Sequence, residues 1–207
     1  MRVRLSSGSK KIRGVLFDLD GTLTLPGALD FPAIKEEMGC PSEVPILEYI
    51  ESRGEEERAH LYKILEKHER KAAKNSIPNE GAIRCLKVLK AKGIQLGIIT
   101  RNSLVSVDQV LRNFEGISAK DFSVIITREN AIPKPDPEGV HKAAEAMGIK
   151  PEELLVVGDF LFDIMAGQTA GAHTALIKNV HPDMDVSLWP KADIEIETLD
   201  ELLRYLC

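Results

Sequence analysis

Cysteine is scarce in this chain: only Cys40, Cys85 and Cys207 occur among 207 residues, and they stand far apart. Neither their number nor their spacing fits a disulfide framework or a pair of metal ligands, so we expect reduced thiols. No apolar run near the N-terminus has the length of a signal peptide, and no segment approaches the length of a membrane span. These absences favour a soluble protein, and we predict a cytoplasmic one.

The chain also lacks a strong net charge. Its formal charge is −5 at pH 7, and its 43% hydrophobic and 29% charged residues are typical of a globular protein. Basic residues gather only at the start, where Arg2, Arg4, Lys10 and Lys11 are interleaved with Ser and Gly but with no aromatic residue. We interpret residues 1–12 as a mobile basic tail rather than a nucleic-acid-binding arm. Neither nucleic acid nor a membrane is an expected partner.

Two common site patterns are missing as well. The sequence Gly-x-x-x-x-Gly-Lys-Ser/Thr does not follow the first strand pattern, which argues against a P-loop nucleotide-binding protein. His68 has no second histidine at metal-ligand spacing, so we interpret it as a packed side chain rather than a zinc ligand.

What the chain does have is a short apolar strand pattern that ends in two aspartates. Val15, Leu16 and Phe17 lead directly into Asp18-Leu19-Asp20-Gly21, where the glycine allows a sharp turn. In open α/β sheets, ligands bind at such carboxyl ends of strands. Two carboxylates this close repel each other, so we expect a cation or a shared proton between them. The alternative is an Asp-rich turn that caps its own backbone.

Residues 25–76 show only helix patterns. Helices are expected from Asp30 to Gly39, over Val44–Glu51 and over Glu55–Asn75. The last of these has an apolar stripe made of Leu61, Ile64, Leu65, His68 and Ala72. We predict that this block is a small all-helical cap inserted after the first strand.

Strand and helix patterns then alternate to the end of the chain. Strands are expected at Ile94–Thr100, Ser123–Thr127, Leu154–Gly158, Thr174–Lys178 and Asp193–Glu197. Helices are expected to end near Lys92 and to cover Ser103–Phe114, Pro137–Met147, Leu161–Ala170 and Leu199–Leu206. This alternation predicts an α/β fold, a parallel Rossmann-like sheet with helices on both faces. Residues 13–24 and 77–207 would form that core domain.

Three further polar clusters fall at or just beyond predicted strand ends. They are Thr100-Arg101-Asn102, Lys134 between two prolines, and Asp159 with Asp163. Because parallel strands present their carboxyl ends along one edge, these clusters can converge with the first. Together they would offer carboxylates, a hydroxyl and an ammonium, with no His or Cys among them. Hard oxygen ligands favour Mg²⁺, and the hydroxyl and ammonium suit a phosphoryl group.

Asp18-Leu19-Asp20-Gly21-Thr22, Thr100, Lys134 and Gly158-Asp159 with Asp163 match, in order and context, the four motifs of the haloacid dehalogenase superfamily. From about Arg13 onward, the chain resembles the phosphatase branch with a helical cap, the phosphoglycolate phosphatase-like group. The resemblance implies a Mg²⁺-dependent phosphatase that hydrolyses small phosphate monoesters.

That resemblance also implies roles for individual residues. Asp18 would be the nucleophile that forms an aspartyl phosphate, and Asp20 the general acid and base. Thr100 and Lys134 would bind the substrate phosphate. Apart from the resemblance, Arg101 is a further candidate for substrate phosphate binding, since it could reach a second anionic group or simply lie on the surface. The implied metal group is Asp18, Asp20, Asp159 and Asp163, with Asp20 contributing its carbonyl and Asp163 orienting a water or Lys134.

Several alternatives stay open from sequence. A sugar phosphomutase could use the same core, because its phosphoaspartate passes phosphate to a sugar instead of water. A non-catalytic protein that binds a phosphorylated ligand is another alternative. A receiver domain shares the acidic residues but is shorter and lacks the helical insertion. The chain also departs from its relatives at Phe160-Leu161-Phe162, which we interpret as packing residues or as an apolar lip beside the substrate.

Overall fold

The computed structural model of the protein describes residues 11–179 and 186–206. Most of the predicted basic tail, and Cys207, lie outside the described residues. Ile12 is buried in the core, so the assignment of a tail up to residue 12 is wrong at that position. Cys40 and Cys85 are buried free thiols.

A six-stranded parallel sheet forms the centre of the described part of the chain, in the order β3-β2-β1-β4-β5-β6. Its strands are β1 (Gly14–Phe17), β2 (Gln95–Ile99), β3 (Val124–Ile126), β4 (Leu154–Gly158), β5 (His173–Ile177) and β6 (Ile194–Ile196). The first strand lies in the middle, where Phe17 aligns with Ile98 of β2 and Val157 of β4. The predicted parallel α/β fold is confirmed.

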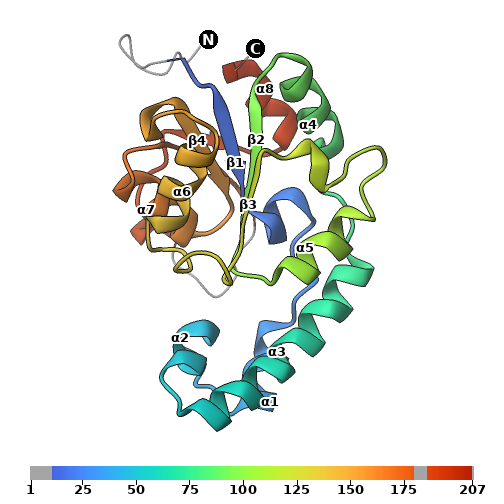
Figure 1. Ribbon diagram of the computed structural model, residues 1–207, viewed down its shortest axis with the longest axis vertical. Helices are drawn as coiled ribbons and strands as arrows, with labels where there is room; N and C mark the ends of the chain where they lie inside the picture. Colours follow the sequence, from blue (N-terminus) through green and yellow to red (C-terminus); the bar gives the residue numbers. More distant parts are fainter. Residues whose placement is uncertain (1–10, 180–185, 207) are drawn as a thin grey trace.

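Helices cover both faces of this sheet, as Figure 1 shows. One face carries α4 (Ala82–Ala91), α5 (Leu104–Leu111) and α8 (Leu199–Leu206), and the other carries α6 (Glu138–Ala146) and α7 (Leu161–Thr169). Neighbouring side chains of β1 point to opposite faces, so Phe17 belongs to the first apolar cluster and Leu16 to the second. Both are fully buried.

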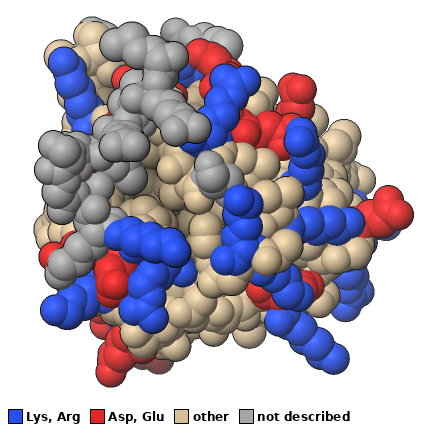
Figure 2. Space-filling model, turned by 90° about the horizontal axis from the view of Figure 1, so that it is seen from above, with Lys and Arg blue, Asp and Glu red and all other residues tan. Residues whose placement is uncertain are grey.

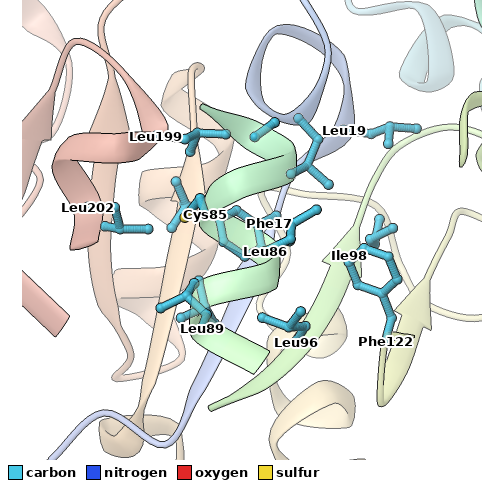
Figure 3. Close-up of a cluster of buried hydrophobic side chains, with 14 of the residues drawn as sticks. Phe17, Leu19, Cys85, Leu86, Leu89, Leu96, Ile98, Phe122, Leu199 and Leu202 are labelled. Atoms are coloured by element: carbon cyan, nitrogen blue, oxygen red, sulfur yellow. The ribbon is translucent and has the colours of Figure 1, made fainter. Parts of the chain in front are cut away.

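The larger apolar cluster is shown in Figure 3. Leu86 and Leu89 of α4 pack beside Phe17, and Leu199 and Leu202 of α8 close the cluster from the side. Fully burying one such side chain contributes about 1.5–3 kcal/mol. This packing holds β1 rigidly, and therefore also the turn that follows it.

The helical block lies beyond the carboxyl edge of the sheet (Figure 1). It contains α1 (Phe31–Met38), α2 (Ile46–Glu51) and α3 (Glu55–Asn75). Asp30 caps α1 by accepting the Ala33 N–H at 3.1 Å, and Gly39 ends it at φ +69°. A separate apolar cluster that includes Ile34, Ile50 and Leu65 joins the three helices.

The buried face of α3 differs from the predicted stripe. Its buried residues are Leu61, Leu65, Glu69, Ala72 and Ala73, whereas Ile64 is only half-buried. His68 is also half-buried and pairs with Glu37 at 2.7 Å instead of packing in the stripe. The difference arises because the second half of α3 packs against α5 of the core, which draws Glu69 inward.

The two linkers between block and core run side by side. Leu25 N–H donates to the Ile77 carbonyl at 2.9 Å, and Asn79 N–H donates to the Leu23 carbonyl at 2.8 Å. Other predicted elements are correct in position but differ slightly in length. The helix expected to reach Phe114 ends at Leu111, and Phe114 is buried in the turn that follows.

The surface carries charges of both signs. Seen from above in Figure 2, Lys and Arg side chains are spread over the face with Asp and Glu among them. Among the described helices, none is both long and apolar enough to cross a membrane.

Candidate active site

The turn after β1 holds the first two aspartates in different environments. Asp18 follows the last residue of the strand and is 8% exposed, and Asp20 lies in a short helical turn, Leu19–Leu23, with non-helical angles. Gly21 has φ +79°, and a Cβ at this position would lie 2.2 Å from Asp159 Oδ2. Only glycine therefore allows the first turn to approach the aspartate after β4.

Lys134 connects two of the strand ends. Its Nζ donates to Asp18 Oδ1 and to Asp163 Oδ1 at 2.5 Å each, and to the Ile99 carbonyl at 3.0 Å. The residue is 4% exposed. Burial alone would lower the pKa of Lys134, but the carboxylates of Asp163 and Asp18 outweigh it and raise the pKa. The ammonium is therefore charged at neutral pH.

The loop that carries Lys134 is anchored just before α6. Asp136 Oδ1 accepts the Glu138 N–H at 2.9 Å, as expected for a capping residue. The helix itself begins at Glu138, one residue later than predicted.

Asp159 and Asp163 meet Asp18 at the end of β4. A Cβ on Gly158 would lie 2.1 Å from Asp163 Cγ, so the absence of a side chain there lets Asp163 reach Lys134. Asp163 also accepts the Phe160 N–H at 3.1 Å, which fixes it in the first turn of α7. Asn179 donates to Asp159 Oδ2 at 2.9 Å and to the Gly21 carbonyl at 2.7 Å.

The three carboxylates form a set that fits a divalent cation. Asp18, Asp159 and Asp163 each present an oxygen, and these oxygens lie within 4.8 Å of one another. All three residues are buried, and hard oxygen donors in such a group suit Mg²⁺ rather than zinc.

Burial perturbs the pKa values of these carboxyl groups. It raises the pKa of Asp18 well above its usual range, while Lys134 acts in the opposite direction. It raises the pKa of Asp159 to about 7, with the neighbouring charge of Asp163 adding to the effect. Lys134 alone does not prevent this rise in the pKa of Asp18 and Asp159, so a further cation would stabilise their ionised forms.

Asp20 is held apart from this group by Asn102. Asn102 Nδ2 donates to Asp20 Oδ2 at 2.5 Å, and the Asn102 backbone N–H donates to Thr100 Oγ1 at 3.1 Å. The Thr100 hydroxyl thus keeps its hydrogen available for another acceptor. Burial raises the pKa of Asp20 to about 6, although the Asn102 hydrogen bond acts against this rise. Such a carboxyl group can exchange a proton near neutral pH.

Arg101 lies at the boundary with the helical block. Its guanidinium donates to Glu48 of α2 at 2.6 Å and to the Lys134 carbonyl, and it lies over the Phe162 ring at 5.0 Å. Phe162 packs edge-to-face against Phe160, which packs in the same way against Trp189. These aromatic residues are half-buried, so they form a partly open apolar rim instead of a buried packing cluster.

The structure thus brings together Asp18, Lys134, Asp159 and Asp163, with Asp20 and Thr100 joined through Asn102. Arg101 lies at the edge of this group, where it contacts the helical block. Sequence reasoning named the segment that contains Asn102 but gave the side chain no role. It missed Asn179 and Glu48 entirely, because neither is part of a pattern at a predicted strand end.

Comparisons with known proteins find relatives over most of the chain. A family model described as haloacid dehalogenase-like hydrolase matches residues 26–177. An uncharacterized hydrolase of Saccharomyces cerevisiae is 33% identical over 203 residues, covering 96% of this chain and 93% of the relative. A phosphoglycolate phosphatase of Escherichia coli O157:H7 is 30% identical over 242 residues, covering 94% and 92%. The crystal structure of a hydrolase from Pseudomonas syringae superposes with a TM-score of 0.76 at 21% identity, covering 94% and 97%.

Proposed function

The chain belongs to the haloacid dehalogenase-like hydrolase family, and we propose that it is a Mg²⁺-dependent phosphatase of small phosphate monoesters. The observation that carries this proposal is the buried contact of Lys134 with both Asp18 and Asp163, beside a separately held Asp20. This arrangement supplies a nucleophile, a fixed positive charge and a proton donor to a reacting group.

Asp18 is the nucleophile in this proposal. Its Oδ1 is engaged by Lys134, which leaves the other carboxylate oxygen to attack phosphorus. The bond between phosphorus and the ester oxygen breaks, and an aspartyl phosphate forms on Asp18. Water then attacks the phosphorus, and inorganic phosphate leaves as the Asp18 carboxylate is restored.

Asp20 moves the protons of both steps. As an acid it protonates the leaving ester oxygen, and as a base it then takes a proton from the attacking water. Its raised pKa, about 6, suits both protonation states near neutral pH. Its hydrogen bond to Asn102 holds the carboxyl group in place.

Lys134 and the Thr100 hydroxyl hold the phosphoryl oxygens. Arg101 now pairs with Glu48, and we assign it to the substrate side of the site. The cation would be held by Asp18 and Asp159 and by the Asp20 carbonyl, with Asp163 oriented behind them. When bound, it would offset the negative charge of the phosphoryl oxygens.

The substrate class rests on relatives rather than on a pocket. The related Escherichia coli protein is a phosphoglycolate phosphatase, and small phosphorylated metabolites are the class that we propose here. A cytoplasmic location is part of the same proposal, since such metabolites and reduced thiols occur there.

The decisive experiment is phosphate release from a panel of esters, with Mg²⁺ and with excess chelator. The panel contains phosphoglycolate, sugar phosphates, nucleotides and pyridoxal phosphate. We expect release that requires the metal and that falls at least about 10³-fold in Asp18→Asn, because the amide cannot act as the nucleophile.

Thermal unfolding of Asp18→Asn provides the control for folding. Near-wild-type turnover in that variant would overturn the assignment of the nucleophile. Turnover that resists chelation would overturn the metal site. Isomerisation of a sugar phosphate without phosphate release would instead establish the mutase.

A further inference from the structure

A buried ion pair joins α3 of the helical block to the core. Arg128 follows β3, and its Nη1 and Nη2 donate to Glu69 Oε1 and Oε2 at 2.5 and 3.0 Å. The two side chains are 5% and 2% exposed. The hydroxyls of Ser103 and Ser106 each lie 3.3 Å from the same carboxylate. Every polar atom of this carboxylate therefore has a partner from the core.

The same arginine also holds the segment that carries Thr100 and Asn102. Arg128 Nη1 donates to the Arg101 carbonyl at 3.2 Å, and the Arg128 backbone N–H lies 3.4 Å from the Asn102 carbonyl. A continuous chain of contacts thus runs from Glu69 through Arg128 and Asn102 to Asp20. It begins in the helical block and ends on the acid and base of the proposed reaction.

A purely stabilising role is a poor explanation for this pair. Taking two charges out of water is costly, and well-packed apolar residues often replace a buried pair at no loss of stability. Burial raises the pKa of Glu69, with Arg128 acting against the rise, which reflects that cost. The contacts of Arg128, however, hold the backbone carbonyls of Arg101 and Asn102, which flank the Asn102 side chain in the sequence.

We propose that Glu69 and Arg128 are positioning residues, which hold the 100–102 segment so that Asn102 orients Asp20 toward the leaving group. The inference rests on the proposed function, because it concerns the proton donor of that reaction. It assigns to α3, an element outside the catalytic motifs, an influence on proton transfer that acts through Arg128 and Asn102.

The test compares two substrates that need the proton donor to different degrees. An alkyl phosphate, such as phosphoglycolate, releases a basic oxygen that must be protonated, whereas p-nitrophenyl phosphate releases a stable anion. In Glu69→Gln and Arg128→Lys we expect kcat/KM for the alkyl ester, which reports formation of the aspartyl phosphate and departure of the leaving group, to fall about 10-fold or more. We expect kcat/KM for the aryl ester to fall less than about 3-fold.

Glu66→Gln is the matched control, since Glu66 lies on the same helix with its side chain 47% exposed. It should leave the ratio of the two rates unchanged. Asn102→Ala removes the hydrogen bond to Asp20 directly, so it shows how large a change in this ratio the loss of that contact can cause. A loss of folded protein would lower both rates equally, so the ratio separates positioning from stability.

A single substitution leaves one buried charge without its partner, which can prevent folding. The double variant Glu69→Leu with Arg128→Met removes both charges together and avoids this problem. We expect it to fold and to keep the defect on the alkyl ester, since the Arg101 carbonyl has lost its donor. A wild-type ratio in this folded double variant would overturn the inference. If the wild-type protein itself releases no phosphate from any ester, the proposed function fails instead.

Discussion

At the scale of single residues, the carboxyl groups of the site accept hydrogen bonds from different side chains. Lys134 binds Asp18 and Asp163, Asn179 binds Asp159, and Asn102 binds Asp20. Burial raises the pKa of Asp18, Asp159 and Asp20, and in each case a different partner acts against the rise. In the proposed reaction the same residue type can therefore act as nucleophile, ligand or acid within one cluster.

The pH dependence of turnover should report Asp20. Its pKa is raised to about 6, so the acid form persists to that pH and is lost as the pH rises further. We expect kcat for an alkyl phosphate to decline at higher pH, and Asp20→Ala to remove the decline and lower kcat by about 10²–10⁴-fold. Steady-state rates across the pH range would measure this. A decline that persists unchanged in Asp20→Ala would show that another group is the acid.

At the scale of elements, the approach of two turns decides where the site can form. The turn after β1 and the turn after β4 meet at Gly21, where φ is +79° and Asp159 lies directly opposite. Gly171 has nearly the same angle, +78°, but a Cβ added there would have no heavy atom within 4 Å. Both glycines have nearly the same backbone angle, but only a Cβ at Gly21 would collide with a neighbouring side chain. Substitution at the two positions can therefore be compared directly.

Alanine at these two glycines should separate strain from contact. We expect Gly171→Ala to cost about 1–2 kcal/mol through the left-handed angle alone and to keep activity. Gly21→Ala should cost more and lower kcat at least about 10-fold, because its Cβ displaces the Asp159 carboxylate. Denaturant unfolding and phosphate release would measure both effects. Equal activity of the two variants would contradict the importance of this contact.

Much of the site could be predicted because its residues follow local patterns. Asp18 and Asp159 end buried apolar strands, and the topology of a parallel sheet brings such ends to one edge. The Glu69–Arg128 pair could not be predicted, since its members are 59 positions apart and neither belongs to a strand-end pattern. Glu69 did interrupt an apolar stripe, but nothing in the sequence indicates which residue would neutralise it.

At the scale of the whole molecule, ion pairs at different depths join the helical block to the core. The Arg101–Glu48 pair is partly exposed, and exposed pairs contribute about 0–1 kcal/mol. The Arg128–Glu69 pair is buried and lies where α3 packs on α5. The position of the block therefore depends on the second half of α3, which runs alongside the core at α5 (Figure 1).

The stability of the whole protein should also depend on the carboxylates of the site. Asp159 has its pKa raised to about 7, so the folded state binds a proton that the unfolded state has released. In chelator, the free energy of unfolding should therefore fall as the pH rises from about 4 to about 7. Asp159→Asn has no such proton to lose, so we expect it to be roughly 2–4 kcal/mol more stable than wild type at about pH 8.

Denaturant unfolding at several pH values, with chelator and with Mg²⁺, would measure this dependence. In the proposed function Mg²⁺ binds the ionised carboxylates of the folded state, so it should restore the wild-type stability at high pH and have less effect on Asp159→Asn. A wild-type stability that is independent of pH in chelator, or that falls equally in the variant, would contradict the linkage. In the proposed function the site keeps negative charges together in order to bind a cation and a phosphoryl group, and this lowers the stability of the protein. The variant removes one of these charges, and a gain in stability is therefore expected.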